Sequence, residues 1–365
     1  MARIFISPSK YVQGAGEMNR IGSYVEKMGK NALCLISAGG RKRHGEQITG
    51  SFASSGAEVS FEPFNGECCQ KEIDRLTAIV KEKGHDVVVG VGGGKIFDTA
   101  KAVAYYTGIP VVVCPTIAST DAPCSGLSVI YTEDGVFERY QFFPSNPNLV
   151  LMDSEIIAAS PVRMTVSGMG DAMATYFEAL ACSRSGAQTC AGGSVGTAAL
   201  GIAKLCYDTL ISEGIKAKIA LEAHALTPAV EKIIEANTLL SGIGFESGGL
   251  AGAHAIHNGL TCLSECHHMQ HGEKVNFGTL TQLVIENMPE DELSDILDWM
   301  TAVGLPVTLG ELGITDLSLE HLMPVAEAAC AEDDTLHNLP LEVTPEIVYN
   351  AMLAADAYGR AALAE

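Results

Sequence analysis

Half of the histidines in this chain lie in one short segment, at spacings that could hold a metal ion. The chain has ten histidines, and five of them fall within residues 252–272. No HExxH pattern is present, so the spacing does not indicate a zinc protease. Clustered imidazoles with a carboxylate elsewhere suit a divalent metal of the zinc or iron type. Asp171 is the candidate carboxylate, because an acidic side chain in its small, apolar surroundings needs a cation or several donors. The five histidines are His254, His257, His267, His268 and His271.

Not every histidine of this segment is expected to be a ligand. A histidine in an apolar segment is more often a hydrogen-bonded core residue, so about two or three of the five should be bystanders. A second candidate within the same segment is a structural zinc site. Its ligands would be Cys262, Cys266, His267 and His268, but Cys-x3-Cys-His-His is not a familiar spacing for zinc.

A glycine-rich turn in residues 86–101 suggests a second site, for an anion. An apolar strand pattern leads into the consecutive glycines 92–94 and then into a helical pattern. Glycine leaves backbone N–H groups unobstructed at the helix N-terminus, where the helix dipole favours an anion. The turn is not a Walker A loop, since Ile96 stands where Ser or Thr would bind magnesium, and Lys95 replaces the last glycine of GxGxxG. The alternative interpretation is a tight turn that binds no ligand. The position of the turn after a buried strand makes this interpretation the less favoured one.

A loop rich in hydroxyl groups, residues 114–126, follows the next apolar strand pattern. Parallel sheets bind ligands at the edge where their strands end. Asp121 in this loop could therefore accept a hydrogen bond from a substrate hydroxyl. The alternative is a turn that caps itself with its own side chains. The hydroxyls that could bind phosphate or ribose are those of Thr116, Ser119, Thr120 and Ser125.

The elements that must position these groups differ between the two parts of the chain. Up to about residue 150, short apolar runs alternate with amphipathic stretches such as 71–83. This alternation predicts a parallel sheet covered by helices on both faces. Two further runs around Asp134-Gly135 predict a β-hairpin. The strand candidates are residues 32–36, 58–61, 86–90 and 111–114, and the hairpin strands are 129–131 and 140–143.

After about residue 155 the strand pattern disappears and helical periodicity dominates, as in the apolar stripe of residues 169–180. The predicted fold is an α/β N-terminal domain with a parallel, Rossmann-like sheet, followed by an all-α C-terminal domain. We expect a dinucleotide-binding domain over residues 1–155 and a helical metal-binding and catalytic domain over residues 156–365. Further helical segments are predicted at 198–211, 228–245, 271–287 and 345–358.

Composition excludes several classes of partner. With 23 Lys+Arg against 44 Asp+Glu, the net charge is 23 − 44 = −21, which disfavours nucleic acid and anionic lipid. The longest charge-free stretches, 102–120 and 185–203, contain prolines or several glycines and hydroxyls, whereas a membrane span needs ~20 mostly apolar residues. Eleven scattered cysteines without a CxxC motif indicate a reducing, cytoplasmic setting. Residues 1–9 do not resemble a signal peptide.

Five motifs together resemble a known family. They are Gly-Gly-Gly-Lys with Asp-Thr-Ala-Lys in 92–101, Pro-Thr-Ile-Ala-Ser-Thr-Asp-Ala-Pro in 115–123, Gly-Asp-Ala in 170–172, the glycine-rich 242–259 and His-Gly-Glu-Lys-Val in 271–275. Nearly the whole chain, from Ser7 to about Tyr358, resembles the glycerol dehydrogenases of the iron-containing (group III) alcohol dehydrogenase superfamily. The resemblance implies zinc-dependent, NAD-linked oxidation of glycerol to dihydroxyacetone and the reverse, with other vicinal diols as further substrates. It also implies a homo-oligomer, because members commonly form octamers.

The resemblance assigns roles residue by residue. Asp171, His254 and His271 match the three metal ligands and so also border the substrate, while Asp121 matches the substrate-contacting aspartate. Asp121 and His254 are the candidate catalytic residues, since either could relay the hydroxyl proton. The other histidines of residues 252–272 match no ligand. Elsewhere in the superfamily a histidine ligand follows the metal aspartate by four residues, and Thr175 in that position favours zinc over iron. The positions that match cofactor contacts are Gly93, Gly94, Lys95, Asp98, Thr116, Ser119, Ser125, Leu127 and Tyr131.

One position departs from the family. At the end of the predicted strand 32–36, relatives carry an aspartate that accepts from the adenosine ribose, and this chain has Ser37. An acidic residue there favours NAD and repels the additional phosphate of NADP. Three basic residues follow at 41–43, although they could simply be a solvated helix start. We therefore expect a cofactor contact at Ser37, NAD as the cofactor, and weaker discrimination against NADP than in relatives.

Related families with other chemistry are alternatives. Dehydroquinate synthases, which are lyases, and glycerol-1-phosphate dehydrogenases resemble the same superfamily, and both would line an anionic substrate with Lys and Arg. Residues 242–273 contain neither, and Lys274 is the only basic residue close to the histidine segment, which favours an uncharged polyol. A metal-storing or NAD-sensing protein without turnover is the non-enzyme alternative.

Overall fold

The computed structural model describes residues 1–364, and its contacts divide the chain into two compact units. The sheet unit comprises Ser7–Ala118 and Ala122–Ser160, and the helical unit comprises Met1–Ile6, Ser119–Asp121 and the chain from Pro161 onward. The short segment Ser119–Asp121 thus groups with the helical unit although the chain on either side of it belongs to the sheet unit. The domain boundary after residue 155 stays a prediction, because grouping by contacts does not test which segment folds on its own.

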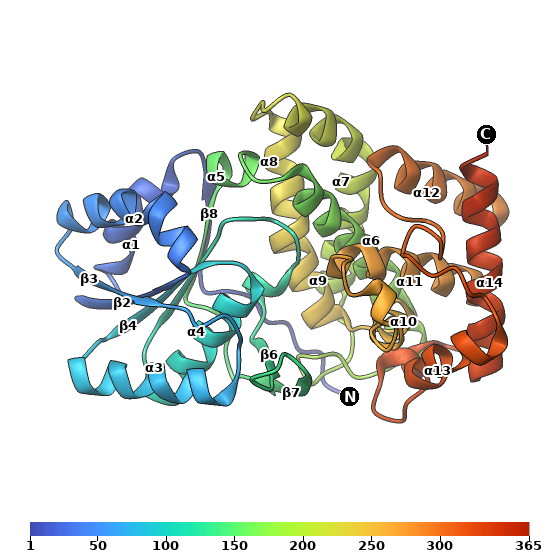
Figure 1. The fold of residues 1–365 in the computed structure, drawn as a ribbon, viewed down its shortest axis with the longest axis horizontal. Helices are drawn as coiled ribbons and strands as arrows, with labels where there is room; N and C mark the ends of the chain where they lie inside the picture. The colour runs from blue at the N-terminus through green and yellow to red at the C-terminus, as the bar shows by residue number, and fades with distance from the viewer. Residues whose placement is uncertain (365) are drawn as a thin grey trace. The chain divides into compact units, whose positions relative to one another are not determined.

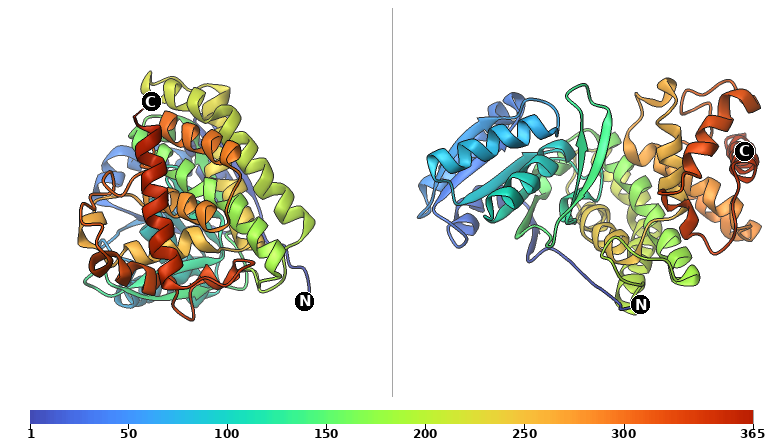
Figure 2. Two further views of the ribbon diagram at one scale, coloured as in Figure 1. Left: turned by 90° about the vertical axis from the view of Figure 1, so that its right-hand side faces the viewer. Right: turned by 90° about the horizontal axis from the view of Figure 1, so that it is seen from below.

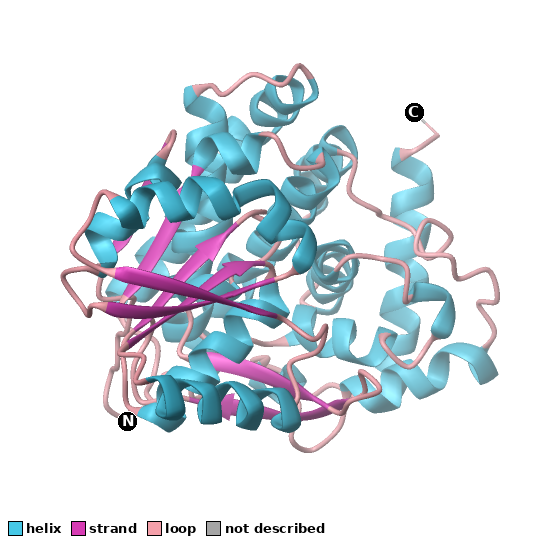
Figure 3. Cartoon of the chain, turned by 60° about the vertical axis from the view of Figure 1, so that its left-hand side comes forward, coloured by secondary structure: helices cyan, strands magenta, loops and turns pink. Residues whose placement is uncertain are grey.

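The sheet unit is built on a six-stranded sheet whose strands all run parallel (Figures 1 and 3). The strand order is β1-β8-β5-β4-β2-β3. The order reverses between β2 and β4, and open parallel sheets bind ligands at the carboxyl ends of the strands beside such a reversal. The strands are β1 Tyr11–Gly14, β2 Asn31–Ile36, β3 Glu58–Pro63, β4 Val87–Gly92, β5 Val111–Pro115 and β8 Leu149–Asp153.

Helices cover both faces of this sheet (Figure 1), as the buried apolar runs of its strands require. Successive side chains of a strand point to opposite faces. Cys34 therefore packs with Ile48 of α2, whereas Leu33 packs with Leu76 of α3. The helices on the first face are η1 Glu17–Arg20, α1 Ile21–Val25 and α2 Ala38–Ala53, and those on the second are α3 Gln70–Lys83 and α4 Gly94–Thr107.

The predicted hairpin is present, and the predicted fold class is confirmed. The strands β6 (Leu127–Tyr131) and β7 (Phe137–Phe142) pair antiparallel, and Gly135 in their turn has a φ of 80°, which glycine adopts without strain. The sequence pattern does not predict β1 and β8. β1 is a short edge strand whose residues are all only partly buried. Between β5 and β8 the chain forms η2 (Ala122–Cys124) and the hairpin in place of a long helix, so the expected alternation is interrupted.

The helical unit contains the predicted helices and three that the periodicity does not predict: α10, α12 and α13. The predicted helix at 228–245 is present as α8, η3 and α9, which follow one another without a break, η3 being a π-helical turn. Figure 2 shows these helices from two further sides. No helix in residues 1–364 is both long and apolar enough to cross a membrane. The bounds are α5 Ser154–Ala158 in the sheet unit and then α6 Val162–Ser185, α7 Thr197–Glu222, α8 Pro228–Glu235, η3 Ala236–Leu240, α9 Ser241–Gly248, α10 Gly252–Leu260, η4 Ser264–Cys266, α11 His271–Ile285, α12 Glu290–Val303, α13 Leu319–Ala329, η5 Thr335–Asn338 and α14 Pro345–Ala362.

Candidate metal and substrate site

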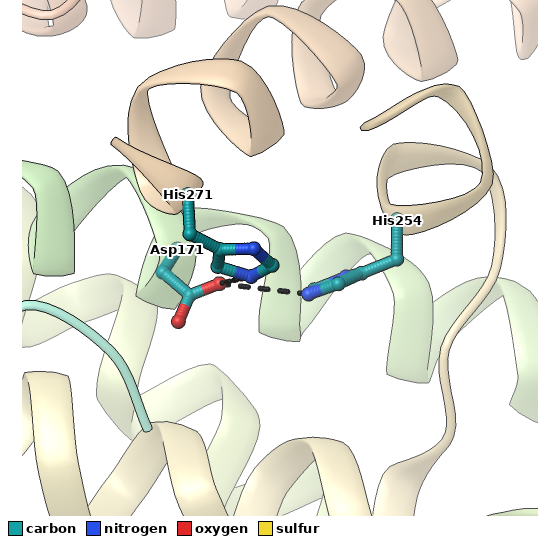
Figure 4. Close-up of side chains that lie close together, drawn as sticks. All are labelled: Asp171, His254 and His271. Carbon is teal, nitrogen blue, oxygen red and sulfur yellow. Dashed lines mark ion pairs between the residues drawn. The ribbon is translucent and has the colours of Figure 1, made fainter. Parts of the chain in front are cut away.

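Three side chains from three helices of the helical unit converge (Figure 4). Asp171 lies on α6, His254 on α10, and His271 is the first residue of α11. Nε2 of His271 lies 3.1 Å and Nε2 of His254 3.5 Å from Oδ1 of Asp171. One ligand atom from each residue lies within 4.8 Å of the others. A carboxylate and two imidazoles at this spacing form a donor set that suits zinc or iron.

Two glycines allow α6 and α11 to approach closely enough for this convergence. Gly170 precedes Asp171, and Gly272 follows His271. A Cβ atom on Gly272 would lie 1.8 Å from the backbone oxygen of Ser167, and one on Gly170 would lie 2.4 Å from the backbone oxygen of Gly272. The two helices therefore touch backbone to backbone, and the neighbouring side chains of Asp171 and His271 meet beside the contact.

A buried carboxylate fixes the ring of His254. Glu178 Oε2 lies 2.7 Å from His254 Nδ1, and Glu178 Oε1 accepts from the backbone N–H groups of Ala251 and His254. An ionised carboxylate can only accept, so Nδ1 of His254 carries the proton. Nε2 then faces Asp171 and is the nitrogen left for a metal, as in metal-binding histidines whose Nδ1 donates to a carboxylate.

A second hydrogen-bond chain fixes the ring of His271. Asn258 donates through Nδ2 to Asp334, which leaves its Oδ1 as an acceptor for Nδ1 of His257, 3.2 Å away. Nε2 of His257 is then an acceptor for Nδ1 of His271, 3.0 Å away. Burial, together with His271 and Lys274, lowers the pKa of His257 well below its usual range, so its ring is neutral. Nδ1 of His271 therefore donates to His257, and its Nε2 faces Asp171 and is the nitrogen left for a metal.

These residues fit a divalent cation. Nε2 of both histidines and Oδ1 of Asp171 point at one another, and such a group of acceptors repels unless a positive charge lies between them. Oδ1 of Asp171 is buried and accepts no hydrogen bond from any residue in 1–364. A buried acceptor without a donor is uncommon and needs such a partner.

A proton is the alternative cation for this cluster. Although burial opposes it, Glu178 and Asp171 raise the pKa of His254 well above its usual range. Burial acts to raise the pKa of Asp171, but His271 and His254 outweigh it and hold that pKa well below its usual range. Metal and protons therefore compete for the same space, and metal binding releases protons.

Asp121, predicted from the hydroxyl-rich loop, lies directly beside this cluster. Its backbone N–H donates to Oδ2 of Asp171 at 3.3 Å, and its own Oδ2 accepts from Ser241 at 2.7 Å. Burial, reinforced by the charge of Asp171, raises the pKa of Asp121 well above its usual range. The structure thus brings together Asp121, Asp171, His254 and His271.

The rival site of two cysteines and two histidines is not assembled. Asp171, His254 and His271 are the one group of three or more close metal-binding side chains in residues 1–364. His267 instead hydrogen-bonds the backbone oxygen of Thr261, and Cys262 is exposed.

The glycine turn of the sheet unit leaves bare backbone at the start of α4. Gly92 has a φ of 153°, and a Cβ there would lie 2.5 Å from Cδ1 of Ile96, so this position requires glycine. Gly93 is the N-cap of α4, and the space beside Gly94 is open to 4 Å. The Lys95 ammonium pairs with Glu67 at 2.6 Å. The turn has the features of an anion site at a helix N-terminus.

Asp98 makes contacts that anchor its own unit. It forms a buried ion pair with Lys101 at 3.1 Å, and its Oδ2 accepts from the backbone of Val129 at 3.0 Å. Lys101 also donates to the backbone oxygen of Ala122. Burial raises the pKa of Asp98, against the opposing charge of Lys101. These contacts tie α4 to the hairpin, and a cofactor contact at Asp98 stays a prediction.

The other predicted cofactor positions surround the same loop. The backbone N–H of Thr116 donates to Gly92, which joins the loop to the glycine turn. Ser125 Oγ donates to the backbone of Ala122, so this hydroxyl caps its own turn. Burial raises the pKa of Tyr131 to about 12. The remaining positions are Leu127, which begins β6, and Ser119, which groups with the helical unit.

Ser37 directly follows the neighbouring strand β2 at the same edge of the sheet. β2 pairs with β4, so Ser37 and the glycine turn follow adjacent parallel strands. The Ser37 hydroxyl accepts from the backbone N–H of Gly40 at 3.0 Å and caps α2. The Arg41 guanidinium lies 3.7 Å from the ring centroid of Phe61, and residues 41–43 are all exposed.

Comparison with known proteins shows the family of this chain. A family model described as iron-containing alcohol dehydrogenase matches residues 8–154. A glycerol dehydrogenase of Escherichia coli O6:H1 is 53% identical over 365 residues, with 100% of both chains covered. The chain belongs to the iron-containing alcohol dehydrogenase family. A glycolaldehyde reductase of Halobacterium salinarum is 47% identical over 360 residues, with 99% of both chains covered. The crystal structure of a probable glycerol dehydrogenase from Sinorhizobium meliloti 1021 has a TM-score of 0.93 and 46% identity, and the match covers 99% of this chain and 100% of that one.

This membership confirms the family that the motifs indicate and makes the chain an oxidoreductase. The sequence patterns do not indicate the groups that orient the candidate site residues, namely Glu178 for His254, His257 for His271 and Ser241 for Asp121. One sequence pattern does point to Glu178. Asp171, Thr175 and Glu178 are spaced i, i+4 and i+7, which places all three on one face of α6.

Proposed function

We propose that this chain catalyses the zinc-dependent, NAD-linked oxidation of glycerol to dihydroxyacetone and the reverse reaction, and that other vicinal diols are further substrates. The observation that carries the proposal is the convergence of Asp171, His254 and His271 beside Asp121. The names of the relatives support a small polyol or hydroxyaldehyde as substrate.

Asp171, His254 and His271 would hold the metal. When bound, zinc supplies a Lewis acid that lowers the pKa of a coordinated hydroxyl, as it lowers that of water from ~15.7 towards ~7. Thr175, four residues after Asp171, offers no imidazole, and its hydroxyl is engaged with Ser241 at 2.8 Å. This three-ligand set supports zinc and leaves positions for substrate oxygens.

Asp121 would hold a substrate hydroxyl and is the better placed of the two candidates for proton transfer. Both nitrogens of His254 are committed, one to Glu178 and the other towards the metal position. In contrast, the one side-chain hydrogen bond to Asp121 within residues 1–364 goes to Oδ2. Its Oδ1 is therefore available to accept a hydroxyl proton and to orient a polyol for reaction.

An uncharged substrate fits the charge of these surroundings. Asp121, Asp171 and Glu178 are all buried near one another, and residues 242–273 contain no Lys or Arg. Acidic surroundings repel a carboxylate or a phosphate. This favours a polyol over the anionic substrates of dehydroquinate synthases and glycerol-1-phosphate dehydrogenases.

The sheet unit would hold NAD along its carboxyl edge. The N-terminus of α4 at Gly93 and Gly94 suits the diphosphate, and Ser37, at the end of the adjacent strand β2, would lie near the adenosine ribose. The remaining proposed contacts are Lys95, Asp98, Thr116, Ser119, Ser125, Leu127 and Tyr131. NADP is a second acceptor on this proposal, because Ser37 carries no charge.

We further propose a homo-oligomer in a reducing, cytoplasmic setting, with neither nucleic acid nor membrane as a partner. All eleven cysteines are free thiols. Apolar side chains on α7 support an association surface, since Leu205 and Ile219 are 53% and 60% exposed. An octamer is what the resemblance implies.

The test is the absorbance of reduced nicotinamide, followed with a panel of polyols, monohydric alcohols, glycolaldehyde and dihydroxyacetone. Glycerol oxidation that is lost on chelation and restored by zinc is the expected result. His254→Ala should lose both zinc and activity, whereas the bystander variants His267→Ala and His268→Ala should keep both. No turnover of any polyol by the zinc-loaded protein, or full zinc content in His254→Ala, would contradict the proposal.

A further inference from the structure

Three buried polar side chains of the helical unit form one hydrogen-bond chain. Ser241 Oγ lies 2.7 Å from Oδ2 of Asp121 and 2.8 Å from Oγ1 of Thr175. Thr175 and Ser241 are fully buried, and Asp121 is 8% exposed. The three residues come from α6, the start of α9 and the segment Ser119–Asp121.

The hydroxyl protons of this hydrogen-bond chain both point towards Asp121. Ser241 donates its single hydroxyl proton to the carboxylate, so Thr175 must donate its own proton to Ser241. Thr175 has little freedom to turn away, because a Cβ on Gly244 would lie 2.5 Å from its methyl carbon. Buried hydroxyls are otherwise costly to leave without partners. The chain therefore holds Oδ2 of Asp121 in one position.

A second contact fixes the backbone of Asp121. Its backbone N–H donates to Asp171 Oδ2 at 3.3 Å. With the backbone held by Asp171 and Oδ2 held by Ser241, the carboxylate plane is set, and Oδ1 is the oxygen left for a substrate hydroxyl. Orientation of this oxygen relative to Asp171 decides which hydroxyl of a polyol can be held.

We propose that Ser241, itself held by Thr175, is a positioning residue for Asp121 and sets the preference for polyols over monohydric alcohols. The inference rests on the proposed function, in which Asp121 binds a substrate hydroxyl. Neither hydroxyl is a metal ligand on this proposal, so their loss should change substrate preference and leave the metal bound.

The experiment compares Ser241→Ala and Thr175→Val with two controls. Thr175→Ser keeps the hydroxyl and should restore wild-type behaviour. Thr238→Val removes an equally buried hydroxyl that has no partner within residues 1–364 and lies three residues before Ser241. For each variant, kcat and KM are measured with glycerol and 2-propanol, together with zinc per chain and the thermal midpoint.

Ser241→Ala should lower the ratio of kcat/KM for glycerol over that for 2-propanol by on the order of tenfold, because the carboxylate loses a hydrogen bond that fixes it. The change should appear mainly in KM for glycerol, with a smaller effect in Thr175→Val and none in Thr175→Ser or Thr238→Val. Zinc per chain should stay at the wild-type level.

Equal losses with both alcohols, or loss of zinc from Ser241→Ala, would overturn the proposal. If Ser241→Ala does not fold, Thr175→Val decides alone, and an unchanged ratio there counts against the inference. A failure of the proposed function would be visible beforehand, because the unmodified protein would then show no preference for glycerol.

Discussion

Glu178 accepts three hydrogen bonds around the start of α10, two from backbone N–H groups and one from the His254 ring. A carboxylate that is hydrogen-bonded to Nδ1 of a histidine makes the imidazole a better metal ligand. His257 and Asn258 orient the ring of His271, and the groups closest to that ring are neutral. The two candidate ligand histidines are therefore oriented by different chemistry, because only the Glu178 arm places a carboxylate directly against the ring.

Removing that charge should weaken the metal site without unfolding the protein. Glu178→Gln keeps the size of the side chain but lowers the basicity of His254, and we expect zinc affinity to fall about 10- to 100-fold. Competition with a chromophoric chelator measures this directly. Glu72→Gln is the control, because Glu72 is a buried carboxylate of the sheet unit, 3% exposed, and its loss should leave zinc affinity unchanged. Wild-type affinity in Glu178→Gln would contradict the assigned tautomer of His254.

The site residues separate into those that sequence could and could not indicate. Asp171, His254 and His271 follow from a histidine cluster and from motifs, because ligands must be particular residue types at particular places. Glu178 escapes notice because a single glutamate within a long amphipathic helix normally faces water. His257 looks like a bystander until the chain of hydrogen bonds to His271 is visible. The orienting roles of Glu178 and His257 depend on which helices pack against each other. The spacing of residues along one helix does not show this packing.

At the scale of elements, the crossing of α6 and α11 decides whether the ligands meet. Gly272 leaves no room for a side chain, since a Cβ there would lie 1.8 Å from the Ser167 oxygen. That oxygen belongs to the backbone of α6 and cannot rotate away. Any larger residue must push the two helices apart and move His271 away from Asp171.

Gly272→Ala should destabilise the protein by about 1–3 kcal/mol, the usual cost of overpacking a core, and should also lower zinc affinity. Denaturant midpoints and chelator competition measure the two effects. Gly201→Ala is the matched control within α7, since Gly201 is exposed and has open space to 4 Å. It should stabilise by about 0.5–1 kcal/mol, because alanine is the better helix former. A neutral Gly272→Ala would show that α6 can move at little cost.

Ser37, at the carboxyl edge of the sheet, leads to a prediction about the preference for NAD over NADP. Ser37→Asp adds a negative charge at the end of β2, where NADP would carry its additional phosphate. A pair of like charges ~4 Å apart in water costs about 1 kcal/mol, so the ratio of kcat/KM for NAD over NADP should rise roughly five- to tenfold. Ser54→Asp, which places the same charge at the opposite end of α2, should leave the ratio unchanged. If the wild type already rejects NADP as strongly as Ser37→Asp, another group compensates for Ser37.

The elements themselves were largely predictable, with instructive exceptions. Buried strands such as β2, β4 and β5 are continuous apolar runs, and α6 and α11 carry long helical periodicity. The pattern does not predict helix α10, because it is only nine residues long and includes two glycines, so its short polar face of His254, His257 and Asn258 spans barely one turn. The pattern of β1 is also weak, because an edge strand buries little.

At the scale of the whole molecule, the proposed metal site connects helices that are far apart in sequence. Its ligands would come from α6, α10 and α11, and the chain carries a net charge of −21. A ligand that binds only the folded state stabilises it, by about 2.7 kcal/mol when its concentration is 100 times its dissociation constant. Zinc should therefore contribute to the stability of the helical unit as well as to catalysis.

Chelation should lower the thermal midpoint, and added zinc should restore it. At roughly 2–4 °C per kcal/mol for a protein of this size class, a shift of about 5–10 °C is expected at saturating zinc. Calorimetry with and without chelator measures the shift, and His254→Ala should show none. An equal response in wild type and His254→Ala would mean that the chelator acts elsewhere.

The three residues Ser119–Asp121 leave the sheet unit and group with the helical unit before the chain returns. Any chimera between relatives that is joined near residue 155 would therefore carry Asp121 along with the glycine turn and Ser37, while the metal ligands would stay with the other parent. Cofactor preference and polyol recognition would be inherited together from one parent and metal chemistry from the other. To exchange only the sheet unit, a recombinant would need two further junctions, one on each side of residues 119–121.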